Sequence, residues 1–446
     1  MHDVIIVGSG PSGIFSALAL AEGGVKNALI LERGKDIGER RRDGGSLLHG
    51  WGGAGAFSDG KLTLSTEVGG ILLEYLSEER LLSLLAEADE LYQKFGAPEE
   101  IHGDDPKEMR ALEERAKKIG LRLVKMTVRH MGTERCYQVL QRLREALDGR
   151  VSIRVESPVG EVLTENGRVR GVKLNSGEVI EAGVVILAPG RSGSAWVREE
   201  AKRIGISTVP SPIDLGVRVE VPAAVFKEIT DITYESKLIY YSRSFDDKVR
   251  TFCMNPFGEV VTEVLDGVVT VNGHSYADRK TENTNFALLV STTFTEPFDN
   301  PINYGRYIAG LANFLGKGVI VQRLGDLLSG RRSTPERIER SIVKPTLKEA
   351  TPGDLSFVLP YRYLKDILEM MEALDHLAPG VHSRHTLLYG VEVKFYSNRL
   401  RLSDTFETEV EGLFAVGDGA GITRGLLQAS CSGLVAGREI VRRIRG

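Results

Sequence analysis

The chain has 446 residues, enough for two or three packed domains, and its hydrophobic share of 42% is ordinary for a globular protein. A formal net charge of −4 argues against a general binder of nucleic acid or of membrane surfaces. Three cysteines without a C-x-x-C pattern imply neither a disulfide framework nor a metal site, and they fit a reducing cytoplasm. No apolar run of suitable length predicts a membrane span.

The first segment predicts a buried strand, a glycine-rich turn and a helix. Residues 4–7 are apolar and mostly β-branched, and a G-x-G-x-x-G pattern follows them. Gly8 permits the tight turn, Gly10 lets a pyrophosphate approach the backbone, and Gly13 lets the helix lie close to the strand. The free N–H groups and the positive end of the helix dipole favour phosphate.

A second apolar strand, residues 28–32, ends at Glu32, an acid placed to bind ribose hydroxyls. Together these features predict a dinucleotide site, against the alternative of a plain strand–turn–helix unit without a ligand. The pattern alone does not separate NAD from FAD. Arg33 could stack on adenine or be solvated, and Arg40, in a run of three arginines, could be solvated or reach the pyrophosphate.

The remaining chain divides by its patterns. Residues 71–128 predict a helical insertion covering the cofactor domain, and residues 211–384 predict a second, α+β substrate domain. The cofactor domain is expected to be discontinuous, formed by 1–70, 129–210 and 385–446. Within these segments we expect helices over 134–148, 305–330, 334–342, 361–375 and 425–444, and strands over 151–188.

Residues 413–421 read as a short buried strand that ends in Gly417-Asp418 before a glycine and a helix. This resembles the C-terminal signature of FAD enzymes of the glutathione-reductase type. The resemblance implies that Asp418 binds the ribityl chain and that the N–H groups of Gly425, Leu426 and Leu427 face the flavin C2 carbonyl. The alternative is an Asx turn that closes the strand.

Two further segments bear on the cofactor site. The resemblance to FAD enzymes implies that the strand 185–190, which ends at Ala188 and Gly190, crosses near the pyrophosphate. It also implies that Val159 contacts the adenine ring. The segment 50–62 has five glycines that let backbone approach a flat ring, and its Lys61 could place a cation near the flavin or be a surface lysine. No second G-x-G-x-x-G occurs in the middle of the chain, so NAD(P)H would dock directly against the flavin, or electrons would come from the substrate or a protein.

Long blocks in order resemble the family of uncharacterised FAD-dependent dehydrogenases. The resemblance implies an α/β fold with a three-layer ββα, Rossmann-like FAD-binding domain and an inserted domain. Members often carry a second cysteine where this chain has Asn255, so a redox role for Cys253 is not implied. The blocks are GGAGAFSDGKL, HMGTE, DLGVRVEVP, TFCMNPFGEVV, VNGHSY, QRLGDLL, LLYGVEVKFYSNRL and AVGDGAGITRGLLQAS.

We therefore expect an oxidoreductase with non-covalent FAD that carries out two-electron hydride transfer on a small molecule. The alternatives are a flavin monooxygenase, a saturating reductase of an apolar substrate, or a non-catalytic binding protein of the same fold. An electron-transfer protein and a second copy of the chain are candidate partners. A tRNA-modifying role is disfavoured by the negative charge.

Lys61, His274 and Glu392 are the catalytic candidates, and His130 and His385 are further candidates for proton transfer. Glu392 and Lys394 share one face of a strand and could form a partly buried ion pair or lie on the solvated side of a sheet. The expected FAD contacts are Gly8, Gly10, Pro11, Ser12, Gly13, Glu32, Arg33, Arg40, Gly53, Ala54, Ser58, Lys61, Val159, Ala188, Gly190, Gly417, Asp418, Gly425, Leu426 and Leu427.

Overall fold

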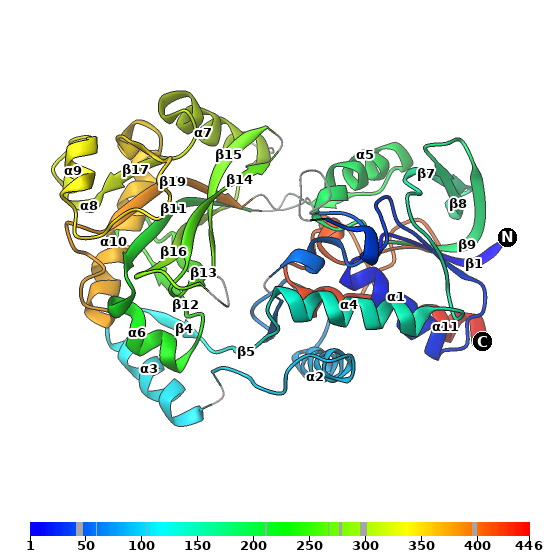
Figure 1. Cartoon of the computed structure of the whole chain (residues 1–446). Coiled ribbons are helices and arrows are strands. Elements are labelled where there is room, and N and C mark those ends of the chain that lie inside the picture. The colour runs from blue at the N-terminus through cyan, green and yellow to red at the C-terminus, as the bar shows by residue number, and fades with distance from the viewer. Residues whose placement is uncertain are drawn as a thin grey trace. The chain divides into compact units, whose positions relative to one another are not determined.

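The chain folds into two compact units, each assembled from segments that are distant in the sequence (Figure 1). Unit 1 comprises Met1–Ile101, Met126–Ser211 and Ser397–Gly446, and unit 2 comprises His102–Lys125 and Pro212–Tyr396. The structure, a computed structural model, describes residues 1–41, 48–58, 60–103, 105–209, 212–265, 267–275, 279–294, 301–394 and 399–446. Asp59, Tyr276 and residues 395–398, which occur in the quoted blocks, lie outside the described residues.

The unit boundaries differ from the expected ones in two places. Residues 71–128 form no separate insertion, because the helix over 78–94 packs in unit 1 and the helix over 106–118 packs in unit 2. Residues 385–396 belong to unit 2 rather than to the cofactor domain. The reason is that the strand over 387–394 is hydrogen-bonded to a central strand of unit 2.

Unit 1 is built on a parallel sheet in the order β6-β2-β1-β9-β21. Val7 pairs with Leu31 on one side and Leu187 on the other. The first part of β9 also pairs with β8 in an antiparallel meander, which adds the second β-layer of the expected ββα architecture. The strands are β1 (His2–Val7), β2 (Ala28–Leu31), β6 (Ser152–Arg154), β7 (Val159–Glu165), β8 (Arg168–Leu174), β9 (Val179–Leu187) and β21 (Leu413–Ala415), with the separate pairs β3 (Lys61–Leu64) and β5 (Thr127–His130), and β10 (Thr208–Val209) and β20 (Arg399–Leu400).

Helices α1 and α11, which are far apart in the sequence, lie against each other beside α4 (Figure 1). Glycines permit this close approach, since a Cβ on Gly433 would lie 2.2 Å from the carbonyl oxygen of Ser12. The hydroxyl of Ser16 donates to the Gly433 carbonyl at 3.1 Å. The helices of unit 1 are α1 (Pro11–Glu22), α2 (Glu78–Lys94), α4 (Thr133–Leu147), α5 (Ser194–Ile204) and α11 (Leu426–Arg445), with 3-10 turns η1 (Ile37–Glu39), η3 (Gly53–Phe57), η4 (Leu72–Glu74), η5 (Arg191–Gly193) and η7 (Asp418–Ala420).

Unit 2 holds an eight-stranded mixed sheet in the order β18-β17-β19-β11-β16-β13-β12-β4, and β14 and β15 form a separate hairpin. Its strands are β4 (Arg122–Val124), β11 (Ile213–Pro222), β12 (Lys237–Tyr241), β13 (Lys248–Asn255), β14 (Glu259–Leu265), β15 (Val268–His274), β16 (Asn283–Thr292), β17 (Ile320–Arg323), β18 (Thr351–Pro352) and β19 (Leu387–Lys394). Its helices are α3 (Pro106–Lys118), α6 (Ala223–Ile232), α7 (Pro301–Gly316), α8 (Leu324–Leu328), α9 (Pro335–Glu339) and α10 (Tyr361–Leu377), with the turn η6 (Leu355–Phe357).

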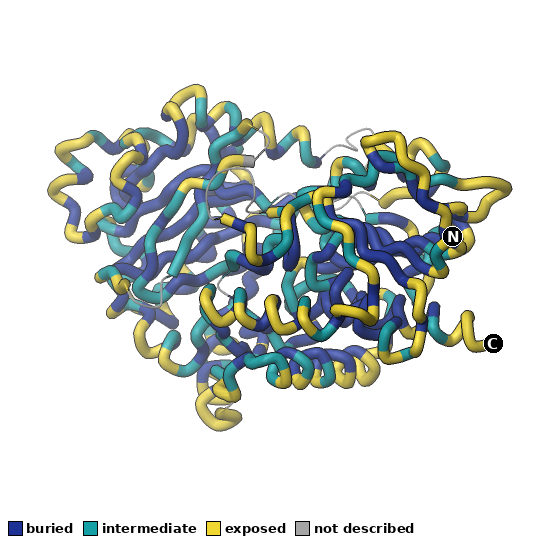
Figure 2. The backbone as a smooth tube through the Cα atoms, turned by 45° about the vertical axis from the view of Figure 1, so that its right-hand side comes forward, coloured by how far each residue is buried: buried dark blue, intermediate teal, exposed yellow. Residues whose placement is uncertain are grey.

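One expected helix is corrected by unit 2. The stretch 305–330 is not one helix, because β17 joins the sheet beside β19 between α7 and α8. The β-branched residues Val319, Ile320 and Val321 explain this choice, since they favour a half-buried pleated surface over a helix. Buried backbone follows the strands of both units, and exposed backbone follows the connecting turns (Figure 2). Within the described residues, none of the helices combines the length and the apolar character that a bilayer crossing requires.

Candidate functional site

The glycine-rich turn after β1 has tight packing at both ends and open space in its middle. A Cβ on Gly8, whose φ is +104°, would lie 2.3 Å from the carbonyl oxygen of Ala188, and one on Gly13 would lie 2.0 Å from that of Gly8. A Cβ on Gly10 would meet nothing within 4 Å. Gly10 is the N-cap residue of α1, and no side chain there accepts a hydrogen bond from the first N–H groups of the helix. The turn therefore offers a space in front of a helix N-terminus, which suits a phosphate group.

Glu32 follows β2 and is almost fully buried, 4% exposed. One carboxylate oxygen accepts from the N–H of Ser9 at 2.9 Å and from its hydroxyl at 2.8 Å. The other accepts from the N–H groups of Gly34 at 2.9 Å and Gly50 at 2.8 Å. The Glu32 carbonyl in turn accepts from the N–H of Ser157, two residues before Val159. Glu32 thus joins the turn, the glycine-rich segment and the start of the meander.

Arg40 holds the glycine-rich segment in place beside the turn. Its Nη1 donates to the carbonyls of Trp51 at 2.6 Å and Gly53 at 2.8 Å, and its guanidinium lies 4.8 Å from the centre of the Phe57 ring. Burial lowers the pKa of Arg40 to about 10, although the nearby charge of Glu32 raises it. Arg40 remains a cation at neutral pH. A Cβ on Gly53 would lie 3.2 Å from the Cα of Gly10, so this segment borders the open space.

The strand β21 brings the C-terminal motif to the same place. A Cβ on Gly417 would lie 2.4 Å from the hydroxyl oxygen of Ser12, and one on Gly419 would lie 3.0 Å from the carbonyl oxygen of Gly190. The Asp418 carboxylate accepts from the Thr423 hydroxyl at 2.7 Å. Burial raises the pKa of Asp418, an effect that Arg191 at 3.6 Å opposes. This packing brings residues 417–419 against Ser12 and Gly190 of the same unit.

The N-terminus of α11 completes the arrangement. Gly425 caps the helix without a side-chain hydrogen bond. A Cβ on Gly55 would lie 3.1 Å from Leu426 Cδ2. Sequence reasoning missed Gln428, whose Nε2 donates to the carbonyls of Ser65, Thr66 and Val68 and so holds residues 65–68 against the helix. A buried glutamine in a helix of small residues was the available signal.

Other predicted contacts occupy the edges of this region. Ala54 lies in η3, and the Ser58 hydroxyl donates to the Gly55 carbonyl at 2.9 Å. Lys61 begins β3, directly opposite His130 on β5. Arg33 is directed to His49 Nδ1 at 3.2 Å, at the exposed side of the turn.

The other two catalytic candidates lie in unit 2. Glu392 is fully buried and accepts two hydrogen bonds from Arg218, at 2.7 Å and 2.9 Å, and Lys394 lies 3.0 Å from it. Burial would raise the pKa of Glu392, but the charges of Arg218 and Lys394 outweigh burial and lower it. An ionised carboxylate locked in this way is the counter-ion of Arg218 and is poorly suited to carry protons.

Arg218 is the residue that sequence reasoning missed in unit 2. Its Nη1 donates to the side-chain oxygens of Asn255 at 3.1 Å and Asn285 at 2.7 Å, and its side chain is fully buried. The signal was present, because an arginine in the apolar strand DLGVRVEVP has to be paired inside the protein. His274, the last residue of β15, pairs across the hairpin with Glu259.

Comparisons with known proteins bear on both units. A family described as FAD dependent oxidoreductase matches residues 3–287, and one described as FAD-dependent protein, C-terminal domain-like, matches residues 212–395. The C-terminal part, 345–446, matches glucose inhibited division protein A. An uncharacterized protein of Clostridium beijerinckii is 29% identical, covering 98% of this chain and 80% of that protein.

Solved structures show a looser likeness. A geranylgeranyl bacteriochlorophyll reductase-like protein from Thermoplasma acidophilum has a TM-score of 0.42 and 15% identity, covering all of this chain and 79% of the other. L-proline dehydrogenase from P. horikoshii has a TM-score of 0.43 and 13% identity, covering 99% of this chain and 94% of the other. A likeness of this degree carries no functional argument.

Proposed function

Because the chain belongs to the family of FAD dependent oxidoreductases, we propose that it catalyses two-electron oxidation or reduction of a small molecule. The protein is an enzyme, and FAD is its cofactor. When bound, FAD supplies hydride acceptance and donation at N5. The observation that supports the proposal is the open space at Gly10, where a Cβ would meet nothing within 4 Å, with Gly53 next to Gly10 and Gly417 packed against Ser12 of the same turn.

The chain's own groups have distinct roles in this proposal. The N-terminus of α1 binds the pyrophosphate at Gly10, and Asp418 accepts a hydrogen bond from the ribityl chain. The N–H groups at the start of α11 stabilise negative charge on the reduced ring, because they lie at the positive end of a 20-residue helix. Lys61 adds a positive charge at the edge of the same unit, and Arg40 keeps the glycine-rich segment in position.

The proposed role of Lys61 can be tested without knowing the substrate. Lys61→Met is expected to make the reduction potential of the bound flavin more negative, because a nearby cation favours the reduced, anionic ring. Lys94→Met, at the exposed end of α2, is the control. Equal potentials in all three proteins, measured by dye-coupled anaerobic titration, would remove Lys61 from the site.

The electron donor decides which oxidoreductase class the protein belongs to. The FAD-loaded enzyme is mixed anaerobically with NADH, NADPH or dithionite, and the loss of visible flavin absorbance is followed. Bleaching by dithionite together with one nicotinamide supports a reductase that takes hydride directly. Bleaching by dithionite alone assigns the donor role to the substrate or to an electron-transfer protein. A preparation that retains no flavin would contradict the proposal itself.

A further inference from the structure

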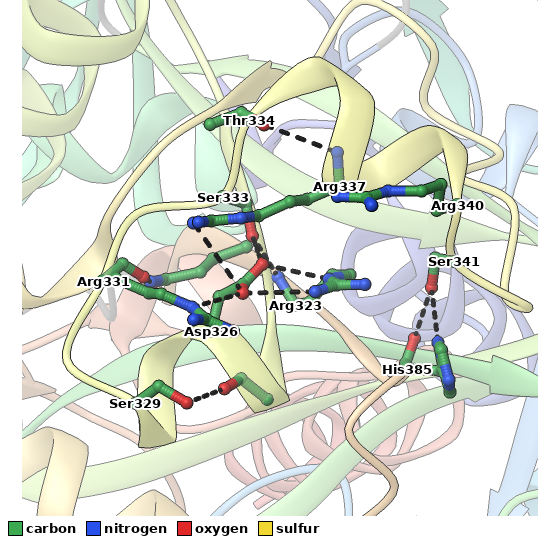
Figure 3. Close-up of polar contacts among 12 residues, drawn as sticks. Arg323, Asp326, Ser329, Arg331, Ser333, Thr334, Arg337, Arg340, Ser341 and His385 are labelled. Atoms are coloured by element: carbon green, nitrogen blue, oxygen red, sulfur yellow. Dashed lines mark hydrogen bonds and ion pairs between the residues drawn. The ribbon is translucent and has the colours of Figure 1, made fainter.

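Unit 2 carries a concentration of arginines that the proposed oxidoreductase site does not use. They surround a depression of about 430 Å³. Part of this cluster comes from QRLGDLL, one of the blocks in the sequence that the cofactor site leaves unexplained. Figure 3 shows the side chains gathered around Asp326 and, beside them, His385. The lining residues are Arg323, Arg331, Arg337, Arg340, Arg384 and His385.

Asp326 orders the inner arginines. Its carboxylate accepts from Arg323 Nε at 3.0 Å and Nη2 at 3.2 Å, and from Arg331 Nε at 3.0 Å (Figure 3). The Ser333 hydroxyl adds a fourth hydrogen bond at 2.8 Å. Burial alone would raise the pKa of Asp326, but the hydrogen bonds from Arg323, Ser333 and Arg331 outweigh it and lower the pKa to about 2. The carboxylate is therefore ionised at all working pH values and fixes two guanidinium groups in advance.

Among the described residues, the outer arginines, Arg340 and Arg384, make no ion pair with Asp326. Among the residues that the structure describes, no hydrogen bond or ion pair involves the Arg384 side chain. Arg340 donates from Nε only to the backbone carbonyl of Glu336, at 3.2 Å. Both side chains are exposed, and both line the depression. Their remaining N–H donors are available to a ligand.

His385 adds a neutral donor at the same depression. Its Nδ1 accepts from the backbone N–H of Ile342 at 3.4 Å, so in the neutral ring the proton resides on Nε2. Burial lowers the pKa of His385, and the charges of Arg323 and Arg384 lower it further. A negatively charged ligand would offset the effect of the two arginine charges on the pKa of His385. It would also accept a hydrogen bond from the imidazole ring.

From this arrangement we infer a binding site for a phosphate-bearing small molecule, formed entirely within unit 2. Among the described residues, Asp326 pairs with Arg323, Arg331 and Arg337, and Glu336 interacts with Arg340, so the five lining arginines outnumber the carboxylates paired with them. The planar guanidinium group matches the geometry of phosphate oxygens in a way that a lysine ammonium does not. A diphosphate has enough oxygens to accept hydrogen bonds from the inner pair, Arg323 and Arg331, and from the outer pair, which line the same depression.

A small ligand fits better than an acidic protein surface. Arg323 is only 7% exposed, so its guanidinium is reached by a compact group that enters the depression rather than by a flat surface. The inner guanidinium groups are already held in place, which lowers the entropic cost of binding. Free diphosphate and a nucleotide-borne diphosphate share this chemistry and are separated by experiment.

The test uses the FAD-loaded enzyme, so that the phosphate-binding turn at Gly10 is already filled. Isothermal titration calorimetry at constant ionic strength measures inorganic pyrophosphate, ADP and adenosine. The expected result is saturable binding of pyrophosphate or ADP and none of adenosine. Tighter binding of ADP than of pyrophosphate identifies a nucleotide, and the reverse identifies an inorganic or other organic diphosphate.

Substitutions then locate the binding. Arg384→Ala is expected to weaken binding about tenfold, as loss of a charge-assisted hydrogen bond does, and Arg384→Lys less, since it keeps the charge. Arg243→Ala, which removes an exposed arginine of unit 2 outside the cluster, is the matched control. Neither Arg384 variant removes a contact that holds the fold. No saturable binding, or equal affinities in wild type, Arg384→Ala and Arg243→Ala, overturns the inference. Either result leaves FAD binding and flavin reduction to be judged separately.

Discussion

Ser9 is bonded twice to one oxygen of Glu32, through its backbone N–H at 2.9 Å and its hydroxyl at 2.8 Å. The other oxygen accepts from two glycine N–H groups, so each oxygen has two donors. Among these four donors, only the Ser9 hydroxyl can rotate away without a movement of the backbone. A ribose hydroxyl that binds Glu32 would therefore replace the Ser9 hydroxyl and leave the turn intact.

Glu32→Gln is expected to weaken FAD binding at least about tenfold, because an amide nitrogen cannot accept and at least one backbone N–H loses its acceptor. Glu22→Gln, at the exposed end of α1, is the control. Fluorescence titration of the apoprotein with FAD measures both. Ser9→Ala should retain near-normal affinity, and a loss as large as that of Glu32→Gln would refute the exchange of hydroxyls.

Alanine substitutions at Gly10 and Gly13 are expected to affect different properties, FAD affinity in the first case and stability of the apoprotein in the second. Gly10 has φ −73° and open space around a Cβ, so Gly10→Ala should leave the thermal midpoint of the apoprotein unchanged while reducing FAD affinity. Gly13→Ala places a methyl group 2.0 Å from the Gly8 carbonyl and should lower the midpoint of the apoprotein itself. Differential scanning calorimetry with and without FAD separates the two effects. Equal midpoints for both apoproteins would contradict this assignment.

The buried Arg218–Glu392 ion pair is expected to contribute to the stability of the fold. Arg218→Met or Glu392→Gln leaves one buried partner uncompensated, which costs about 3–5 kcal/mol. Glu411→Gln, which breaks an exposed pair with Arg168, should hardly change the urea midpoint. Flavin reduction by dithionite is measured in the same variants. A stable Glu392→Gln protein that has lost substrate turnover would restore Glu392 as a catalytic candidate.

Asp366 on α10 predicts a pH dependence of stability. Burial raises the pKa of this carboxyl to about 6, and the neighbouring Asp247 carboxylate contributes. Between about pH 4 and 6 the unfolded chain loses this proton while the folded chain keeps it, so rising pH favours unfolding through this group, and the loss persists above pH 6. Asp366→Asn should therefore raise the thermal midpoint at pH 8 more than at pH 4. The same change at both pH values would contradict the raised pKa.

Much of unit 1 was predictable because local patterns there coincide with the fold. The glycines at 8, 10 and 13 have separate steric reasons, and each is visible in the sequence as a fixed spacing. The terminal strand–turn–helix could be recognised in the same way. Gln428 is noticeable as a polar residue in a helix of small residues, but its carbonyl partners at 65–68 were not predictable, because they come from a segment without a repeating pattern.

Unit 2 was less predictable because its arrangement depends on long-range pairing. Nothing local indicates that residues 387–394 lie beside 213–222, and so the sequence patterns predict a domain boundary before residue 387. The face shared by Glu392 and Lys394 was predicted from strand alternation, and the ion pair is present. The larger partner, Arg218, lies 174 positions away, and its position depends on the sheet order.

The packing of Gly433 against Ser12 also has a consequence for biosynthesis. The first helix emerges from the ribosome early, but its partner helix and Asp418 are translated only after all of unit 2. During translation the nucleotide-binding turn therefore lacks one wall, and the nascent chain cannot hold the cofactor firmly. Firm binding of FAD is therefore expected only after the segment that carries Asp418 and Gly433 has been made.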